Sequence, residues 1–158
     1  MDDEDVHELA ELRAERAIHR VMLRYARGVD SRDFEMVRDC FHPEARVTWG
    51  DWFSGTRDES IDWLSQAIPR LEGTLHVFAS PWIELDLASG SAEAETYAVN
   101  SARYPADENG SCVQNVAGTR YFDRFELRDG EWKLIERRNE RIWVQNTREE
   151  VAEPTINA

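Results

Sequence analysis

The apolar residues of this chain change their spacing once, and that change decides which fold class the chain can adopt. In residues 8–28 they recur every three or four positions, which is typical of one face of an amphipathic helix. The same spacing predicts two shorter helices at 34–41 and 57–68, the second opening with a Ser/Thr-x-x-Glu capping box. From residue 74 onward the apolar residues alternate with polar ones, which indicates strands.

Helices followed by a run of strands predict an α+β domain, in which the helices pack on one face of a curved antiparallel sheet. The predicted strands span 46–53, 75–79, 82–87, 92–104, 112–127 and 132–145. The dipeptide Asp129-Gly130 predicts a tight hairpin turn between the last two. We expect the long strands to curve so that their inner face stays covered, which gives a cone-shaped sheet with an interior.

The length and charge of the chain exclude several classes of protein. Its 158 residues suit one domain over 1–158, with a core at about 8–146 and a tail at 147–158 that has no periodicity. A formal net charge of -13 argues against nucleic acid or an anionic membrane as the main partner, because both bind basic surfaces. The sequence contains no apolar run of about 18 residues, and we expect a cytoplasmic protein.

The sequence offers no motif for a bound metal or cofactor. Cys40 and Cys112 are far apart, and the histidines outside position 76 do not have the spacing of metal ligands. A glycine-rich phosphate loop and a nucleophile elbow are both absent from the sequence. We therefore expect chemistry that needs no cofactor, no metal and no covalent serine intermediate.

Asp30 and His76 are the first candidates for catalysis. Asp30 follows the predicted first helix, and His76 opens the strand region between apolar neighbours. If the fold brings them together, the carboxylate orients the imidazole as a general base requires. Each residue alone also has a structural interpretation, Asp30 as part of an interhelical turn and His76 as a half-buried strand histidine bonded to a backbone carbonyl. On the residues alone the structural interpretation is favoured.

Tyr25 and Arg141 are the second pair of candidates. Tyr25 lies on the apolar stripe of the first helix, either as a core aromatic residue or as a phenol that points into a pocket. Arg141 shares a strand with Asn139 and Trp143, and alternation predicts that all three face the same side. An inward arginine would stabilise a developing negative charge on a substrate oxygen. Three nearby arginines are expected mostly at the surface: Arg124, Arg137 and Arg138.

The order of these elements and several motifs resemble the SnoaL-like family of the nuclear transport factor 2-like superfamily. The matching segments are 18–20 with Tyr25, 29–34, 41–45, 73–76 and 122–133. The resemblance covers about residues 8–146 and implies the cone-shaped, cystatin-like α+β barrel of that superfamily. It does not by itself fix the activity, because one fold hosts many functions.

The resemblance also implies roles for particular residues. Scytalone dehydratase, lindane dehydrochlorinase and bile acid 7-alpha-dehydratase in that superfamily use an Asp–His pair, and Asp30 and His76 match its positions. Tyr25 and Arg141 match a tyrosine and an arginine of the bile acid enzyme. This chain departs from the pattern at Asn100, where that enzyme is acidic, and near Ser101, where scytalone dehydratase has a second histidine. With the resemblance, the catalytic interpretation of Asp30 and His76 becomes the favoured one.

The resulting expectation is a cofactor-independent lyase, a dehydratase, that acts on an apolar ring-containing substrate of steroid, polyketide or aromatic type. An isomerase or cyclase on a similar ligand, or a non-catalytic ligand-binding or assembly subunit, remain as alternatives. The open sheet face also predicts a homo-dimer or homo-trimer. The residues expected to line the substrate pocket are Trp49, Trp52, Phe53, Tyr97, Asn100, Tyr121 and Trp143.

Overall fold

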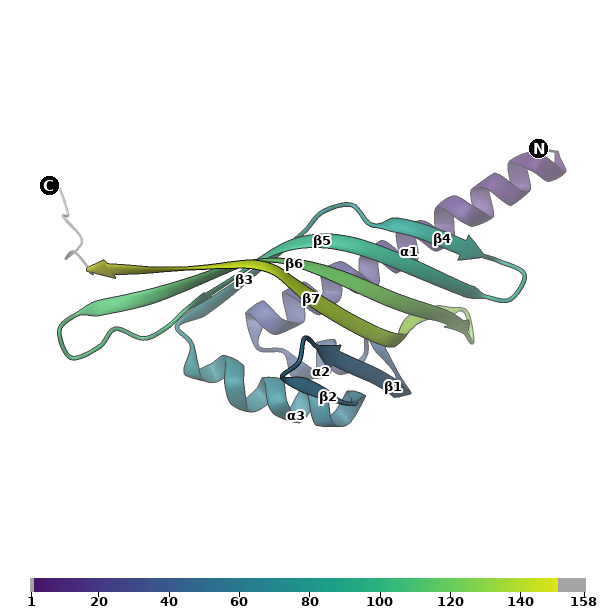
Figure 1. The fold of residues 1–158 in the computed structure, drawn as a ribbon. Helices are drawn as coiled ribbons and strands as arrows, with labels where there is room; N and C mark the ends of the chain where they lie inside the picture. The colour runs from purple at the N-terminus through teal and green to yellow at the C-terminus, as the bar shows by residue number, and fades with distance from the viewer. Residues whose placement is uncertain (1, 151–158) are drawn as a thin grey trace, which may run out of the picture.

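The computed structural model describes residues 2–150, which form three helices and a seven-stranded sheet (Figure 1). Helix α1 spans Asp3–Ser31 and is longer than the predicted 8–28. A capping box between Asp2 and Asp5 begins it, since each side chain accepts a hydrogen bond from the other residue's backbone N–H. It ends at Arg32, whose left-handed backbone (φ 60°) directs its N–H back to carbonyls of the last turn.

Helix α2 (Phe34–Arg38) is shorter than the predicted 34–41, because strand β1 (Phe41–Trp49) already begins at residue 41. Pro43 therefore lies inside a strand rather than ending a helix. The pairing of β1 with its neighbour β7 is irregular between Phe41 and Arg46, so the missing N–H of Pro43 disrupts no ladder hydrogen bond there.

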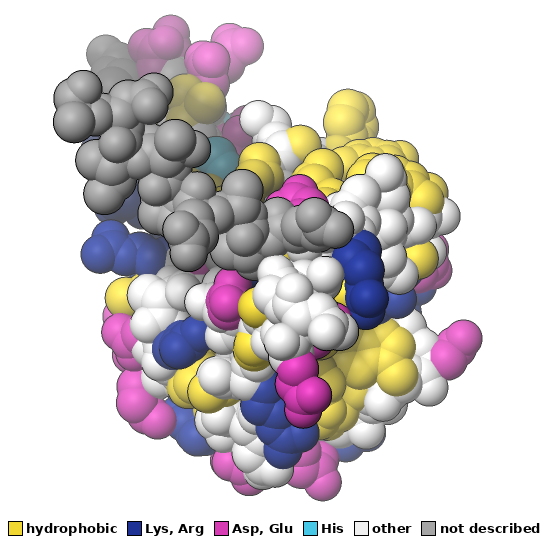
Figure 2. All heavy atoms as spheres, turned by 90° about the vertical axis from the view of Figure 1, so that its left-hand side faces the viewer, with side chains coloured by type: hydrophobic (Ala, Val, Ile, Leu, Met, Phe, Trp, Pro, Cys, Tyr) yellow, Lys and Arg dark blue, Asp and Glu magenta, His cyan; other side chains and the backbone are white. Residues whose placement is uncertain are grey.

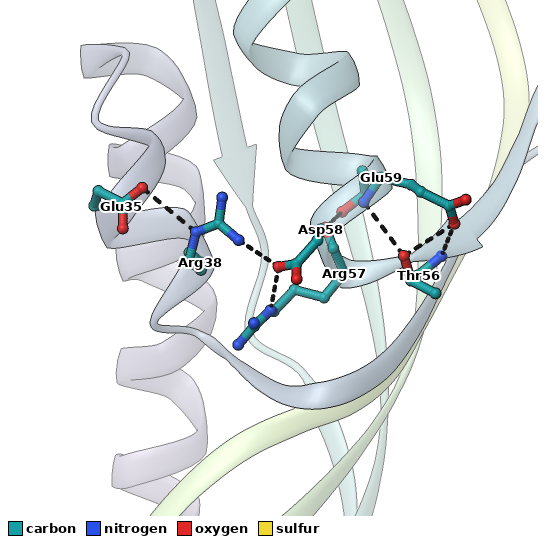
Figure 3. A network of polar contacts seen from close by, with 7 residues as sticks. Glu35, Arg38, Thr56, Arg57, Asp58 and Glu59 are labelled. Carbon is teal, nitrogen blue, oxygen red and sulfur yellow. Dashed lines mark hydrogen bonds and ion pairs between the residues drawn. The ribbon is translucent and has the colours of Figure 1, made fainter.

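Helix α3 (Arg57–Ala67) begins with the predicted capping box, which the structure confirms. Thr56 Oγ1 accepts a hydrogen bond from the N–H of Glu59, and Glu59 accepts one from the N–H of Thr56 (Figure 3). Asp58 also bonds Arg38, so the start of α3 is tied to the end of α2. A short 3-10 turn, η1 (Ile68–Arg70), follows at Pro69 and leads into the sheet.

The predicted strand at 46–53 is wrong, because a turn at 50–52 divides that stretch between β1 and a second short strand, β2, whereas the strands from β3 onward follow the predicted boundaries more closely. The remaining strands are β2 (Phe53–Thr56), β3 (Gly73–Phe78), β4 (Trp82–Asp86), β5 (Ser91–Arg103), β6 (Ser111–Arg128) and β7 (Glu131–Glu150). The predicted turn at Asp129-Gly130 joins β6 to β7, and both residues have positive φ, 52° and 80°. Strand β7 continues into the region expected to be an aperiodic tail, of which 151–158 lie outside the described residues.

The strand order is β2-β1-β7-β6-β5-β3, and β4 also pairs with β5. The expectation of a purely antiparallel sheet is wrong, because β1 runs parallel to β7. Parallel neighbours need a long connection, and here everything from β2 to β6 supplies it. Within the described residues the end strands β2 and β3 do not pair with each other, so the sheet is curved but not closed into a barrel.

Helix α1 crosses the concave face of the sheet and supplies much of the core (Figure 1). Ile18, Met22 and Val29 are 0%, 0% and 1% exposed, and they pack with Phe125 and Leu134 of the sheet. Each such side chain contributes about 1.5–3 kcal/mol when it is removed from water. Seen from the end of the sheet opposite the start of α1, hydrophobic side chains gather on one side of the molecule (Figure 2).

Strand β7 contains an extra residue, Ile142, that changes which side chains face inward. Thr119 of β6 pairs with Arg141, whereas the preceding Gly118 pairs with Trp143. The expectation that Arg141 and Trp143 share a face is therefore wrong, because a bulge of one residue reverses the alternation. Trp143 lies directly over Gly118, so an added Cβ at Gly118 would overlap the indole.

None of the helices within residues 2–150 combines the length and the apolarity that crossing a bilayer requires.

Candidate active site

Asp30 and His76 are in direct contact, although 45 residues separate them along the chain. Asp30 lies in the last turn of α1, not beyond its end as the sequence suggested, and His76 lies in the middle of β3. His76 Nδ1 is 2.7 Å from Asp30 Oδ1, and the His76 backbone N–H donates to Asp30 Oδ2 at 2.9 Å. The side chain of His76 is only 14% exposed and that of Asp30 only 23%, so the pair is shielded from water.

The local sequence explains why the pair forms. The left-handed residue Arg32 stops α1 and turns its guanidinium to the carbonyl of Leu71 at 2.7 Å, which fixes the helix end against the start of β3. Thr74 is two residues before His76 and therefore faces the same side of β3, where its hydroxyl donates to Asp30 Oδ1 at 2.8 Å.

These hydrogen bonds favour the ionised form of Asp30 and one tautomer of His76. Partial burial alone would raise the pKa of Asp30, but the donors on His76 and Thr74 outweigh it and hold the pKa of Asp30 below its ordinary value. An ionised carboxylate only accepts hydrogen bonds, so the proton of neutral His76 is on Nδ1 and Nε2 keeps its lone pair. Within the described residues, no protein group bonds to Nε2 of His76.

A cavity of about 230 Å³ lies beside His76 between the helices and the inner face of the sheet. Tyr25, His76 and Arg141 line it, whereas Asp30 is not part of its wall and supports His76 from behind. Of the expected pocket residues, the cavity wall includes four: Trp49, Trp52, Asn100 and Tyr121.

The other three expected pocket residues lie outside this cavity wall, so these placements were wrong. Phe53 packs behind Trp49, with ring centroids 4.6 Å apart. Tyr97 is on the outer face of β5 and 53% exposed, and Trp143 is turned outward by the bulge and 48% exposed.

An aromatic wall closes one side of the cavity. Trp49 of β1, Trp52 of the β1–β2 turn and Trp63 of α3 pack together with centroid distances of 5.0–5.5 Å. Trp63 was missed because it lies off the apolar stripe of α3 and contacts the hairpin instead of the main core. Its isolation on a polar helix face was the available signal.

Polar side chains line the opposite part of the cavity, close to His76. Asn100 is the register partner of His76 on β5, and its Nδ2 donates to Tyr121 Oη at 2.9 Å and Thr119 Oγ1 at 3.2 Å. Its carbonyl Oδ1 is buried and has no hydrogen-bond partner among the described residues. Asn139 lines the cavity together with Arg141, as alternation along the strand predicted, whereas Thr119 was not anticipated from the sequence.

Arg137 is fully buried, contrary to the expectation that it lies at the surface. It forms a two-point ion pair with Asp123, with Nε–Oδ1 and Nη2–Oδ2 distances of 2.8 and 2.7 Å, and neither side chain is exposed. Burial alone would lower the pKa of Arg137, but the Asp123 carboxylate raises it, so the guanidinium remains charged. It stacks on the rings of Tyr25 at 4.1 Å and Tyr121 at 4.9 Å.

Tyr25 and Arg141 present two kinds of proton donor to the cavity. Burial raises the pKa of Tyr25 well above its ordinary value, so its phenol stays protonated. Arg141 is exposed at the cavity wall, and no ion pair to it is found within residues 2–149. The same part of the chain contains no group of three or more His, Cys, Asp or Glu side chains placed to hold a metal ion.

Comparison with known proteins places this geometry in context. A family model described as a SnoaL-like domain matches residues 10–138. A candidate scytalone dehydratase from Novosphingobium aromaticivorans has a TM-score of 0.75 and 23% identity, over 96% of this chain and 97% of that chain. A type 2 hexachlorocyclohexane dehydrochlorinase (LinA) has a TM-score of 0.74 and 17% identity, over 96% and 99%.

A protein of unknown function from Nostoc punctiforme, described as having a cystatin-like fold, has a TM-score of 0.64 and 17% identity, over 79% and 88% of the two chains. At these identities the likeness shows a shared fold. No curated protein sequence matches the chain.

Proposed function

Because the chain belongs to the SnoaL-like domain family, we propose that it is a cofactor-independent lyase that removes water from a small ring-containing substrate. The observation that carries this proposal is the 2.7 Å contact between Asp30 and His76 Nδ1 at the wall of a cavity. A neutral imidazole held in one tautomer by a carboxylate is suited to abstract a proton near neutral pH.

In the proposed reaction, His76 Nε2 takes a proton from the carbon next to a substrate carbonyl. The electrons of the broken C–H bond form the enolate, whose oxygen gains negative charge. As the enolate collapses, a C=C bond forms and the C–O bond to the β-hydroxyl breaks. The protonated His76 returns its proton to that oxygen, which leaves as water, and the enzyme is restored.

Two donors are available for the enolate oxygen. The protonated phenol of Tyr25 donates a hydrogen bond, and the guanidinium of Arg141 supplies a positive charge. Donors that are already oriented before the charge develops lower the barrier more than mobile water does. The stacking of Arg137 on Tyr25 holds the phenol ring in the cavity wall.

The cavity restricts the class of substrate. A cavity of roughly 150 Å³ holds one benzene molecule, and the present one is about 230 Å³. Its volume therefore accommodates one or two rings of a substrate beside His76. The unpartnered Oδ1 of Asn100 beside His76 favours a substrate with a hydroxyl group to donate to it, such as a cyclic β-hydroxy ketone.

The experiment uses 3-hydroxy-1-indanone and related one- and two-ring β-hydroxy ketones as probes, with the unsaturated ketone measured by absorbance and mass. We expect His76→Ala to lower kcat/KM by about 10²–10⁴-fold, the range of general-base catalysis, while its circular dichroism spectrum remains that of the folded protein. His7→Ala is the matched control, because His7 is an exposed histidine of α1 remote from the cavity.

Asp30→Asn tests the role of the carboxylate. It should lower kcat far more than it raises KM, because orientation of His76 matters in the transition state rather than in binding. Equal losses would assign Asp30 a structural role. A product of unchanged mass would identify an isomerase instead, and full activity of His76→Ala, or no turnover of any probe by the wild type, would contradict the dehydratase proposal.

A further inference from the structure

The first turns of α1 form an arm that projects beyond the sheet (Figure 1). Val6 and Leu12 on this arm are 50% and 55% exposed, and Leu9 between them is half-buried. A short helical segment without a packing partner is only marginally stable in water. A surface that covers these three aliphatic side chains would therefore stabilise the arm.

The solvent-facing side of the arm has an ordered pattern of charge. Because successive residues of a helix are 100° apart, seven residues fall within about a third of its circumference, opposite the buried Ile18 and Met22. In chain order they are Asp2, Asp5, Val6, Leu9, Leu12, Arg13 and Arg16. From the N-terminus onward, this face is therefore first acidic, then aliphatic and then basic. No ion pair to Asp2, Asp5, Arg13 or Arg16 is found within residues 2–149.

This pattern is complementary to itself when reversed. Asp2 and Arg16 lie seven residues on either side of Leu9, Asp5 and Arg13 lie four residues away, and Val6 and Leu12 lie three. Two copies related by a two-fold axis present the same surface to each other, so each contact occurs twice. An axis at Leu9 brings every acidic side chain opposite a basic one and encloses the aliphatic residues.

We propose that two copies of this chain associate through the outer faces of their α1 arms, antiparallel about a two-fold axis at Leu9. The charge pattern favours a second copy over a different partner, because in an antiparallel pair the acidic residues of each arm lie opposite the basic residues of the other. The contact is short, so the dimer is weak and its charged rim is sensitive to salt.

Sedimentation velocity of the full chain at tens of micromolar and low ionic strength tests the proposal. The wild type should be dimeric under these conditions. Arg13→Glu/Arg16→Glu should be monomeric, because its charges oppose the acidic residues of the partner. Asp2→Asn/Asp5→Lys should also be monomeric, and its asparagine retains a helix cap.

The decisive sample is an equal mixture of the two variants. In a mixed pair every contact is again attractive or neutral, so the dimer should return. The loss of the Asp5 side of the capping box in one variant cannot produce this rescue. Arg20→Glu/Arg27→Glu is the matched control, since it makes the same charge change on the same face beyond the contact and should remain dimeric.

The proposal would be overturned by a wild type that stays monomeric or by a dimer that survives Arg13→Glu/Arg16→Glu. It would also be overturned by a control that dissociates like that variant, or by a mixture that does not reassociate. A dimer that survives both charge variants would place the contact on another surface, such as the outer face of the sheet.

Discussion

Removing one partner of the buried pair between Asp123 and Arg137 should destabilise the protein strongly. In Asp123→Leu, the Arg137 guanidinium would remain in a site where its side chain is 0% exposed and would lose both of its carboxylate contacts. Breaking a fully buried ion pair in this way costs about 3–5 kcal/mol of unfolding free energy. That is a large share of the roughly 5–15 kcal/mol expected for a whole domain.

Most of the lost unfolding free energy should return when the charge of Arg137 is removed as well. In the double variant Asp123→Leu/Arg137→Met no charge is left unpaired, so stability should return to within about 2 kcal/mol of the wild type, the remainder being the lost stacking on Tyr25 and Tyr121. For a domain of this size, the single variant corresponds to a fall in Tm of about 6–20 °C.

Urea unfolding followed by circular dichroism measures these differences. Arg124→Met is the control, because Arg124 pairs with Glu136 at 3.3 Å with both side chains about half exposed, and an exposed pair contributes less than about 1 kcal/mol. If Asp123→Leu costs no more than this control, or if the double variant is no more stable than the single one, the burial argument is refuted.

Two further predictions concern the end of α1. The pKa of Asp30 is lowered by folding, so its ionised form stabilises the protein above about pH 4, and this contribution is lost as the pH falls through the folded-state pKa. Asp30→Asn should therefore be less stable than the wild type at pH 7 and equally stable near the acid limit. Urea midpoints measured across pH test this, and a stability difference that is the same at all pH values would contradict it. Gly28→Ala should lower the free energy of unfolding by about 1–3 kcal/mol, because its Cβ would come 2.7 Å from Val37 and push α2 away. Gly73→Ala is the control: its Cβ meets nothing within 4 Å, so its loss of Tm should be much smaller.

Local sequence signals predicted the features that depend on neighbouring residues. The capping box at Thr56 and the hairpin turn at Asp129-Gly130 are set by a few adjacent residues, and both are present in the structure. The approach of Asp30 to His76 was inferred from the family resemblance and not from spacing, because it spans most of the helical half of the chain. Its catalytic role remains a proposal.

Features that depend on distant pairing were not predicted. The parallel placement of β1 beside β7 is a choice between sheet edges that no local pattern records. Arg137 resembled its surface neighbours Arg124 and Arg138 in sequence, and only the position of Asp123 on the adjacent strand accounts for its burial. Trp143 was assigned to the wrong face because a single extra residue in β7 is invisible to an alternation rule.

Removing the extra residue, Ile142, would not change which of its neighbours in β7 faces inward and which faces outward. Deleting this codon would keep Arg141 opposite Thr119 and Trp143 opposite Gly118, since those pairs already stand in regular order without it. What would change is the bend of the strand, because a bulge kinks and twists the strand that carries it. A chain without Ile142 would therefore keep Arg141 at the cavity wall and would change only the course of β7 beyond it.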